Sequence, residues 1–167
     1  MTMASPFQHD FLVRFEESVI SKRLVKPGSH LLLAVSGGID STTMAHVFHQ
    51  LRQRLQLTLG IVHVNHMLRG EEANADEEFV RSLAGSLGMP FFSSRVDTAE
   101  YAHVQGMGKQ EAARELRYQF FHEVRMRTSA DALATPHTAD DNAETVLMNA
   151  LRGSGVHGLA GIPLRRE

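Results

Sequence analysis

The sequence predicts an α/β fold: a doubly wound parallel sheet with helices on both faces. Short apolar runs alternate with helical patterns from residue 30 to residue 152, as happens when parallel strands are joined by right-handed helical crossovers. Polar clusters follow strand-like runs at 36–41, 63–69 and 135–144. Ligands bind beyond the carboxyl ends of the strands in such sheets, so the three clusters are expected to converge on one crevice.

The spacing of apolar residues predicts each element in turn. Helical spacing predicts an N-terminal helix over 7–24, which Pro27-Gly28 ends. Short apolar runs predict the strands, at 30–35, 57–64, 91–96 and 131–135. Apolar stripes predict the later helices, near 44–54, 79–87, 113–124 and 140–151. Residues 97–108 are glycine-rich and are expected to be irregular. We therefore divide the chain into an N-terminal helix (1–28) and a main domain (29–167).

Composition excludes several classes of protein. At 167 residues, 43% apolar and 22% charged, the chain is typical of a soluble globular domain. It has no cysteine, so disulfides, thiolate zinc sites and iron–sulfur clusters are excluded, and a cytoplasmic location is expected. No apolar run approaches the roughly 18 residues of a membrane span. The net charge of −2 gives no overall attraction to nucleic acid, although 14 of the 17 basic residues are arginine, which grips phosphate in two-point contacts.

A glycine-rich loop, Ser36-Gly-Gly-Ile-Asp-Ser41, follows the first buried strand and precedes a helix. Its glycines allow a sharp turn and a close approach of phosphate, and the helix start offers unpaired N–H groups to an anion. Asp40 would repel a bare phosphate, so it fits as a ligand of Mg²⁺ or of another substrate group. The loop lacks the Gly-Lys-Ser/Thr ending of a Walker A motif. The alternative is a simple helix-capping turn, with Asp40 and Ser41 as caps.

An acidic segment follows the last predicted strand. If the helix starts near Thr138, then His137, Asp141 and Glu144 share one face. Adjacent acids beside a phosphate loop need a cation, either Mg²⁺ or a substrate ammonium. The alternative is that Asp140 and Asp141 only favour the helix N-terminus, with Thr138 as the cap.

Two further clusters carry basic side chains. Arg114 and Arg117 share a helix face that suits phosphate, with surface pairing to Glu111 and Glu115 as the alternative. His63 and His66 have the spacing of a metal pair but lack a third ligand, so a strand end that recognises a base edge is an equal alternative. Gly153-Ser-Gly-Val-His-Gly158 matches a dinucleotide fingerprint only as a string, because it follows a helix rather than a strand.

Five blocks of the chain together resemble a known family. Ser36-Gly-Gly-Ile-Asp-Ser41 is similar to the loop of the N-type ATP pyrophosphatases, the PP-loop ATPases with an adenine-nucleotide α-hydrolase-like fold. Four later blocks, in the same order, resemble the tRNA(Ile)-lysidine synthetases: His63-Val-Asn-His-Met-Leu-Arg69, Glu111-Ala-Ala-Arg-Glu-Leu-Arg-Tyr118, His137-Thr-Ala-Asp-Asp-Asn-Ala-Glu-Thr145 and Arg152-Gly-Ser-Gly155. Other AMP-forming ligases and tRNA-thiolation enzymes share the first block, so the later blocks narrow the resemblance.

The resemblance implies a ligase that uses ATP and Mg²⁺. The wobble cytidine of tRNA(Ile), with a CAU anticodon, attacks the α-phosphate of ATP through its C2 oxygen, and pyrophosphate leaves. Free L-lysine then displaces AMP and forms lysidine. Activation is needed because a base carbonyl oxygen is a poor leaving group, whereas a phosphate with a second pKa near ~6 departs readily. The oligomeric state stays open, a homodimer included.

The resemblance also implies roles for individual residues. The ATP phosphates and Mg²⁺ would be bound by the residues of the glycine-rich loop: Ser36, Gly37, Gly38, Ile39, Asp40 and Ser41. The strand end at 62–64, with Val64, would hold adenine, and Arg117, with Arg114, would contact phosphate. His137, Asp141 and Glu144 would serve the α-phosphate, the metal (Asp141) or the lysine ammonium, in a division that stays open. Asp40, Arg117, His137, Asp141 and Glu144 are thus the catalytic candidates.

The chain departs from the family in two places. Pro136 stands where the family has a small residue before the histidine. The sequence stops at Glu167, where family members continue into tRNA-gripping domains, so a C-terminal truncation is expected. Three alternatives remain: another AMP-forming PP-loop ligase, a thiolation-like enzyme or an inactive ATP-binding fragment. The absence of cysteine counts against thiolation.

Overall fold

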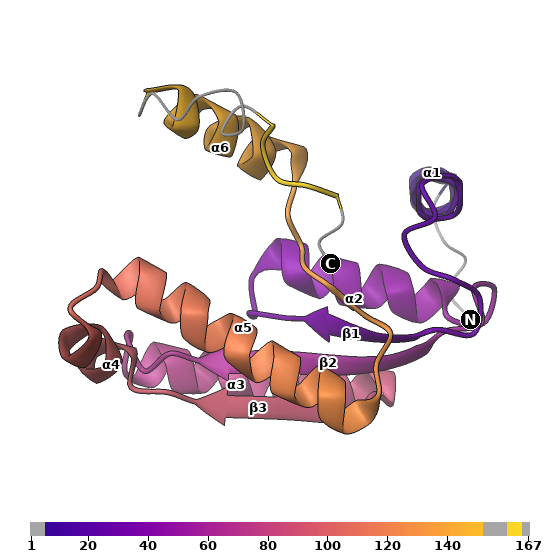
Figure 1. Ribbon diagram of the computed structural model, residues 1–167. Coiled ribbons are helices and arrows are strands. Elements are labelled where there is room, and N and C mark those ends of the chain that lie inside the picture. Colours follow the sequence, from indigo (N-terminus) through magenta and orange to yellow (C-terminus); the bar gives the residue numbers. More distant parts are fainter. Residues whose placement is uncertain (1–5, 152–159, 165–167) are drawn as a thin grey trace. The chain divides into compact units, whose positions relative to one another are not determined.

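The computed structural model of the chain describes residues 6–151 and 160–164 (Figure 1). The chain divides into two compact units, each described here by itself. One is Val25–Thr135, and the other combines Met1–Leu24 with Pro136–Glu167. The Arg152–Gly155 block and the glycine string at 153–158 lie outside the described residues.

A parallel sheet forms the centre of the unit Val25–Thr135. Its strands are β1 (His30–Ala34), β2 (Thr58–Asn65), β3 (Phe91–Arg95) and β4 (Ala132–Ala134), in the order β3-β2-β1-β4. All three strand pairs are parallel, which confirms the predicted sheet. The two central strands are almost fully buried because both of their faces are covered.

Helices cover both faces of this sheet (Figure 1). The helix α5 (Lys109–Thr128) lies in front of it in this view and α3 (Glu71–Leu87) behind it. Leu32 and Val62 of the sheet form a core cluster with Phe121 and Val124 of α5. The helix α2 (Ile39–Leu51) packs against β1 and β2.

The prediction of irregular structure at 97–108 was wrong, because α4 (Thr98–Gln105) lies there. The Asp97 carboxylate accepts a hydrogen bond from the backbone N–H of Glu100 at 2.9 Å and caps the helix start. Gly106, with φ +65°, ends it. The segment has no apolar stripe, since only Thr98 and Ala102 are buried, and periodicity therefore missed it.

The other unit contains α1 (Pro6–Ser21) and α6 (Ala139–Leu151). The helix α1 stops before residue 24, since Arg23 adopts a positive φ of 51°. The start of α6 directly after Thr138 confirms the predicted boundary. Further along the chain, the Ile162 N–H donates to Asn142 Oδ1 at 2.6 Å and ties segment 160–164 to α6. Among the described helices, none is long and apolar enough to cross a bilayer.

Candidate functional site

The glycine-rich loop lies where β1 meets α2. Val35 is buried, whereas Ser36, Gly38 and Asp40 are exposed. Gly37 has a φ of +99°, which only glycine adopts without strain. Gly38 is the N-cap of α2 and contributes no side-chain cap, so the first turn of the helix keeps N–H groups available to a ligand.

Ser41 closes this loop from within. Its hydroxyl donates to the Gly38 carbonyl at 2.9 Å and accepts from the Ser36 N–H at 3.2 Å. The Ser36 and Ser41 hydroxyl oxygens are also 3.2 Å apart. Only 1% of Ser41 is exposed, so in this state its hydroxyl shapes the loop while Ser36 faces solvent.

The end of β2 is fixed to the end of β1 by His63. Its Nδ1 lies 2.8 Å from the Val35 carbonyl oxygen, which can only accept, so Nδ1 carries the proton. In the neutral ring Nε2 is then an acceptor, and it is buried without a hydrogen-bond partner in the described structure. Val64, the predicted adenine contact, lies one residue further on and packs partly against the core cluster.

His66 faces a different set of groups. Its Nδ1 lies 3.0 Å from the hydroxyl of Thr98 at the start of α4. Burial, followed by the charges of Arg117 and His63, lowers the pKa of His66 to about 4. His66 is therefore neutral near pH 7, and Arg117 lies close enough to act on it. His63 and His66 form no metal centre: within the described ranges no three potential ligand side chains gather around a cation site.

Arg114 and Arg117 of α5 do not form the surface ion pairs with glutamate that the sequence left as an alternative. Arg114 stacks on the ring of Tyr118, with 5.1 Å from its guanidinium carbon to the ring centroid. Glu115 accepts instead from the Tyr101 hydroxyl at 2.9 Å and from Gln119 at 3.2 Å. In the part of the chain that the structure describes, neither Arg114 nor Arg117 forms an ion pair with Glu111 or Glu115.

A second loop, residues 65–70, borders the glycine loop. Arg69 donates from Nη2 to Asp76 Oδ2 at 2.9 Å. The other Asp76 oxygen faces Gly37, since a Cβ placed on Gly37 would lie 3.4 Å from it. The unit Val25–Thr135 thus brings together residues from the loops after β1 and β2.

The acidic segment belongs to the other unit, where it caps α6. Asp141 Oδ2 accepts from the Thr138 N–H at 2.6 Å and from its hydroxyl at 3.0 Å, and the Asp141 N–H donates to the Thr138 hydroxyl at 3.1 Å. These bonds lower the pKa of Asp141. Glu144 and Asp140 are exposed on the same helix, and His137 precedes it. A meeting of these residues with the glycine loop stays a prediction.

Comparisons with known proteins show the family of the chain. A family model described as a PP-loop domain matches residues 7–167. The chain belongs to the PP-loop domain family. The resemblance drawn from the glycine loop is thereby confirmed.

Several curated relatives of this PP-loop domain carry the name tRNA(Ile)-lysidine synthase. The relative from Chlorobaculum tepidum is 45% identical over 152 residues, 91% of this chain and 46% of that protein. The one from Petrotoga mobilis is 38% identical and covers 95% and 51% of the two chains. The one from Clostridium perfringens strain 13 is 43% identical and covers 85% and 30%. The chain thus spans about half of these relatives' length or less.

Two solved structures share the fold of the PP-loop domain. The U34-tRNA thiolase NcsA from Methanococcus maripaludis, with its [4Fe-4S] cluster, aligns at a TM-score of 0.69 and 21% identity, covering 89% of this chain and 52% of its own. The NH3-dependent NAD synthetase from Campylobacter jejuni aligns at 0.53 and 11% identity, covering 91% and 74%. These likenesses support the predicted α/β architecture.

The PP-loop domain also contains a buried acidic centre that the sequence analysis missed. Glu77 of α3 is 3% exposed and accepts hydrogen bonds from Asn65, Ser93, Arg81 and Arg95. Burial acts to raise the pKa of Glu77, but the bonds from Arg95, Asn65 and Ser93 outweigh it and lower the pKa overall. The apolar stripe predicted this helix only near 79–87, so Glu77 fell just before it, and an apolar pattern does not reveal a buried carboxylate.

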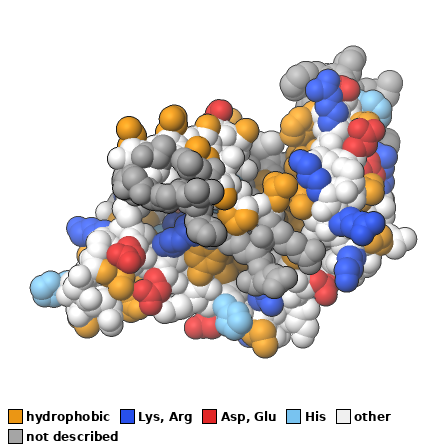
Figure 2. Space-filling model, turned by 45° about the horizontal axis from the view of Figure 1, so that its top comes forward, with side chains coloured by type: hydrophobic (Ala, Val, Ile, Leu, Met, Phe, Trp, Pro, Cys, Tyr) orange, Lys and Arg blue, Asp and Glu red, His pale blue; other side chains and the backbone are white. Residues whose placement is uncertain are grey.

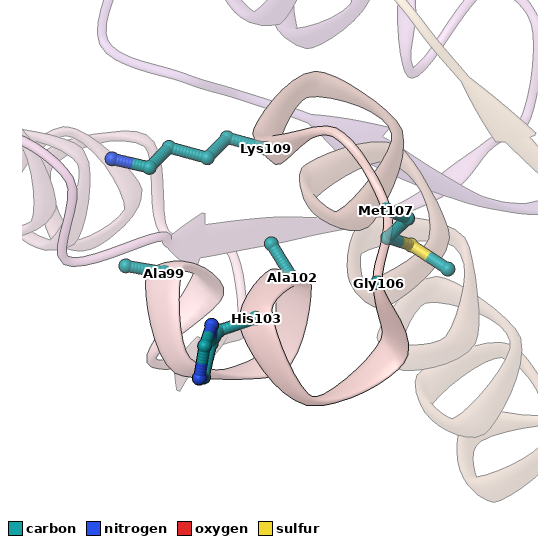
Figure 3. A pocket seen from close by; sticks show the side chains of 6 residues that line it. All are labelled: Ala99, Ala102, His103, Gly106, Met107 and Lys109. Carbon is teal, nitrogen blue, oxygen red and sulfur yellow. The ribbon is translucent and has the colours of Figure 1, made fainter.

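A shallow hollow of about 360 Å³ lies between α4 and the start of α5 (Figure 3). Its lining residues are Ala99, Ala102, His103, Gly106, Met107 and Lys109. None of the predicted site residues of the PP-loop domain lines it. The predicted phosphate-binding loop lies after β1 instead, and its role stays a prediction.

Proposed function

We propose that this chain carries the ATP-binding and adenylating part of a tRNA(Ile)-lysidine synthase. The C2 oxygen of the wobble cytidine attacks the α-phosphorus of ATP, and the bond to the pyrophosphate oxygen breaks. The amine of free lysine then attacks C2 and displaces AMP. A proton leaves the amine, and lysidine remains in the tRNA.

The observation that carries this proposal is the similarity to curated relatives of that name. Those cited are 38–45% identical over 85–95% of this chain, and the similarity includes the glycine loop. The thiolase supports the fold alone, and a chain without cysteine lacks the ligands of an iron–sulfur cluster. The lysidine reaction is therefore favoured over thiolation.

The glycine loop suits the pyrophosphate end of ATP. Gly37 and Gly38 leave the backbone open to phosphate oxygens, and the start of α2 directs N–H groups toward them. Ile39 and Asp40 are exposed in the first turn of that helix, and Ser36 is exposed just before it. Positioning and preorganised dipoles supply most of the catalysis in such nucleotidyl transfers.

Mg²⁺ fits the donor set of this loop. The exposed Asp40 carboxylate is the kind of hard oxygen ligand that Mg²⁺ takes beside nucleotide phosphates, with waters filling the other positions. Asp141 would be a second ligand, and Thr138 already holds its carboxylate in place at the start of α6. When bound, the ion would neutralise charge on the phosphates.

The remaining predicted residues would serve the other substrates. We assign adenine to the strand end at Val64 and the nucleotide phosphates to Arg117, with Arg114 beside it. His137, Asp141 and Glu144 would bind the lysine ammonium and take up its proton. The partners are then tRNA(Ile) with a CAU anticodon and L-lysine, in the cytoplasm, with one chain or two per active assembly.

Incubation with ATP, labelled lysine and tRNA(Ile) tests the proposal. We expect lysine in the tRNA and release of AMP and pyrophosphate in equal amounts. Asp40→Ala should abolish adenylation, while Glu123→Ala, an exposed acid on α5, should not change it. Release of ADP, or normal turnover by Asp40→Ala, would contradict the assignment of the loop. Binding of ATP without turnover would support the binding-fragment alternative.

A further inference from the structure

The wall of the glycine loop carries an ion pair that the reaction above does not use. Asp76 of α3 lies against Gly37, with its Oδ1 and Cβ 3.4 and 3.5 Å from a Cβ placed on that glycine. Its other oxygen accepts from Arg69 Nη2 at 2.9 Å. The Asp76 carboxylate thus lies between the Arg69 guanidinium and the glycine loop.

The backbone that carries Arg69 is fixed at both ends. The Asn65 carbonyl oxygen Oδ1 accepts from the Met67 N–H at 3.0 Å and supports the positive φ of 54° at Met67. The Asn65 amide donates in turn to the buried Glu77 at 3.2 Å. After the loop, the Glu72 N–H bonds the Arg69 carbonyl at 3.2 Å. The position of Arg69 along the wall is therefore set before any ligand arrives.

The side chain of Arg69, by contrast, is 65% exposed and its Asp76 partner is 35% exposed. An ion pair as exposed as this one contributes little to stability. A guanidinium binds phosphate through two parallel hydrogen bonds, which a single contact to Asp76 does not match. A bare Asp76 carboxylate would also repel phosphate at Gly37, so the pair fits the loop only if Arg69 offsets that charge.

We propose that Arg69 is a further phosphate-binding residue, which contacts the terminal phosphates of ATP and holds the leaving pyrophosphate, with Asp76 as its positioning residue. This inference rests on the proposed function, because it assumes that the glycine loop takes the pyrophosphate end of the nucleotide. It adds a cationic side to a loop whose own charged residue, Asp40, is acidic.

Binding measurements on the full chain test the role of Arg69. We expect Arg69→Ala to weaken binding of ATP and of inorganic pyrophosphate about tenfold, as for loss of one charged hydrogen bond, and to leave AMP binding unchanged. Arg69→Lys should recover part of the loss. Arg125→Ala removes an exposed arginine from the last turn of α5 and should change the affinity for neither ATP nor pyrophosphate.

The outcomes separate this inference from the proposed function. If the wild-type chain binds no ATP, the proposed function fails. Suppose instead that the wild-type chain binds ATP. The inference on Arg69 is then overturned if the Arg69→Ala variant binds ATP as tightly as wild type, or if its affinity for AMP falls as much as its affinity for ATP. Thermal unfolding of the variant shows that its fold is intact.

A double variant tests the role of Asp76. If Asp76 acts through Arg69, Asp76→Ala weakens pyrophosphate binding, and the Arg69→Ala/Asp76→Ala protein binds no more weakly than Arg69→Ala alone. Asp76→Asn keeps an acceptor for Arg69 and should bind better than Asp76→Ala. Additive losses in the double variant would overturn the positioning role.

Discussion

Gly37 determines the shape of the glycine loop through one backbone angle. Its φ of +99° is strained for any residue with a Cβ, and Asp76 occupies the space in front of it. We expect Gly37→Ala to cost about 1–3 kcal/mol of folding free energy or to distort the loop and abolish ATP binding. Urea unfolding and ATP titration of the variant measure both effects.

Gly85 provides the matched control for that prediction. It lies near the end of α3, has no positive φ, and a Cβ there would meet nothing within 4 Å. Gly85→Ala should therefore stabilise the protein by about 0.5–1 kcal/mol and leave ATP binding unchanged. Similar losses in both variants would mean that Gly37 has no special role.

His66 makes stability depend on pH. The pKa of His66 in the folded protein is about 4, below the ordinary histidine value of 6.5, so between these values the unfolded chain binds more protons. Stability is fully present above pH 6.5 and falls as the pH decreases toward 4, by up to about 3 kcal/mol. His66→Gln should flatten the dependence in urea unfolding between pH 4 and 7. An unchanged slope would assign it to other groups.

For single residues, the sequence predicted where the glycine-rich loop lies in the chain better than it predicted which side chains contact it. The loop residues Ser36 to Ser41 were identified because glycine and serine between a strand and a helix carry their own signal. Asp76 and Glu77 were missed as site residues, since nothing in a helical pattern shows that one carboxylate faces Gly37 and its neighbour is buried. Such contacts arise from the tertiary packing of α3.

The helix α3 illustrates how an element joins two strands to the site. Its buried Glu77 accepts from Asn65 of β2 and from Ser93 and Arg95 of β3. We expect Glu77→Gln to destabilise the protein by about 1–3 kcal/mol, because the new amide group faces donors instead of accepting from them. Urea unfolding measures the loss.

Its neighbour Glu78 is the control. The Glu78 side chain is 72% exposed and, among the described residues, its ion pair is with Arg81 at 3.4 Å, so Glu78→Gln should stay within about 0.5 kcal/mol of wild type. The pKa of Glu77 is lowered, so its stabilising effect is present at neutral pH and is lost as acid protonates the folded form. Equal losses of folding free energy in Glu77→Gln and Glu78→Gln would contradict the special role of the buried Glu77 carboxylate.

The start of α6 separates two roles for Asp141. Thr138 and Asp141 cap the helix reciprocally, and Thr138→Ala should loosen it by about 1 kcal/mol, seen as faster amide exchange in the first turn. Asp141→Ala should loosen α6 similarly but also abolish adenylation. If Thr138→Ala reduced turnover as strongly, Asp141 would act only as a cap.

Elements with a strong local signal were predictable. The start of α6 was found because the threonine and the acid three residues later form a visible capping pattern. The helix α4 was missed because its cap, Asp97, precedes only eight residues with few buried side chains.

On the scale of the whole molecule, strand order explains why segments that are distant in the sequence reach the same edge of the sheet. β1 pairs with β2 on one side and with β4 on the other, all in parallel. Their carboxyl ends therefore lie at one edge of the sheet, and the clusters at 36–41 and 63–69 leave neighbouring strands there, while a meeting with the cluster at 135–144 stays a prediction. The alternation of patterns predicted this edge, but which strands are neighbours depends on crossovers that a single sequence does not specify.

Charge is the whole-molecule property that bears on tRNA. The chain has 17 basic and 19 acidic residues, and both signs are visible on the face in Figure 2. Each phosphate that a protein neutralises steepens the salt dependence of binding by about 0.7–0.9 in log–log slope. With a net charge of −2, few such contacts are expected.

We therefore predict a slope no steeper than about −2 for tRNA(Ile) binding by this chain, measured by filter binding between 50 and 200 mM salt. A slope of about −4 or steeper would mean that the arginines gather into a phosphate-binding surface despite the net charge. ATP binding, which we assign to the glycine loop, should not change when tRNA is added in the same salt range.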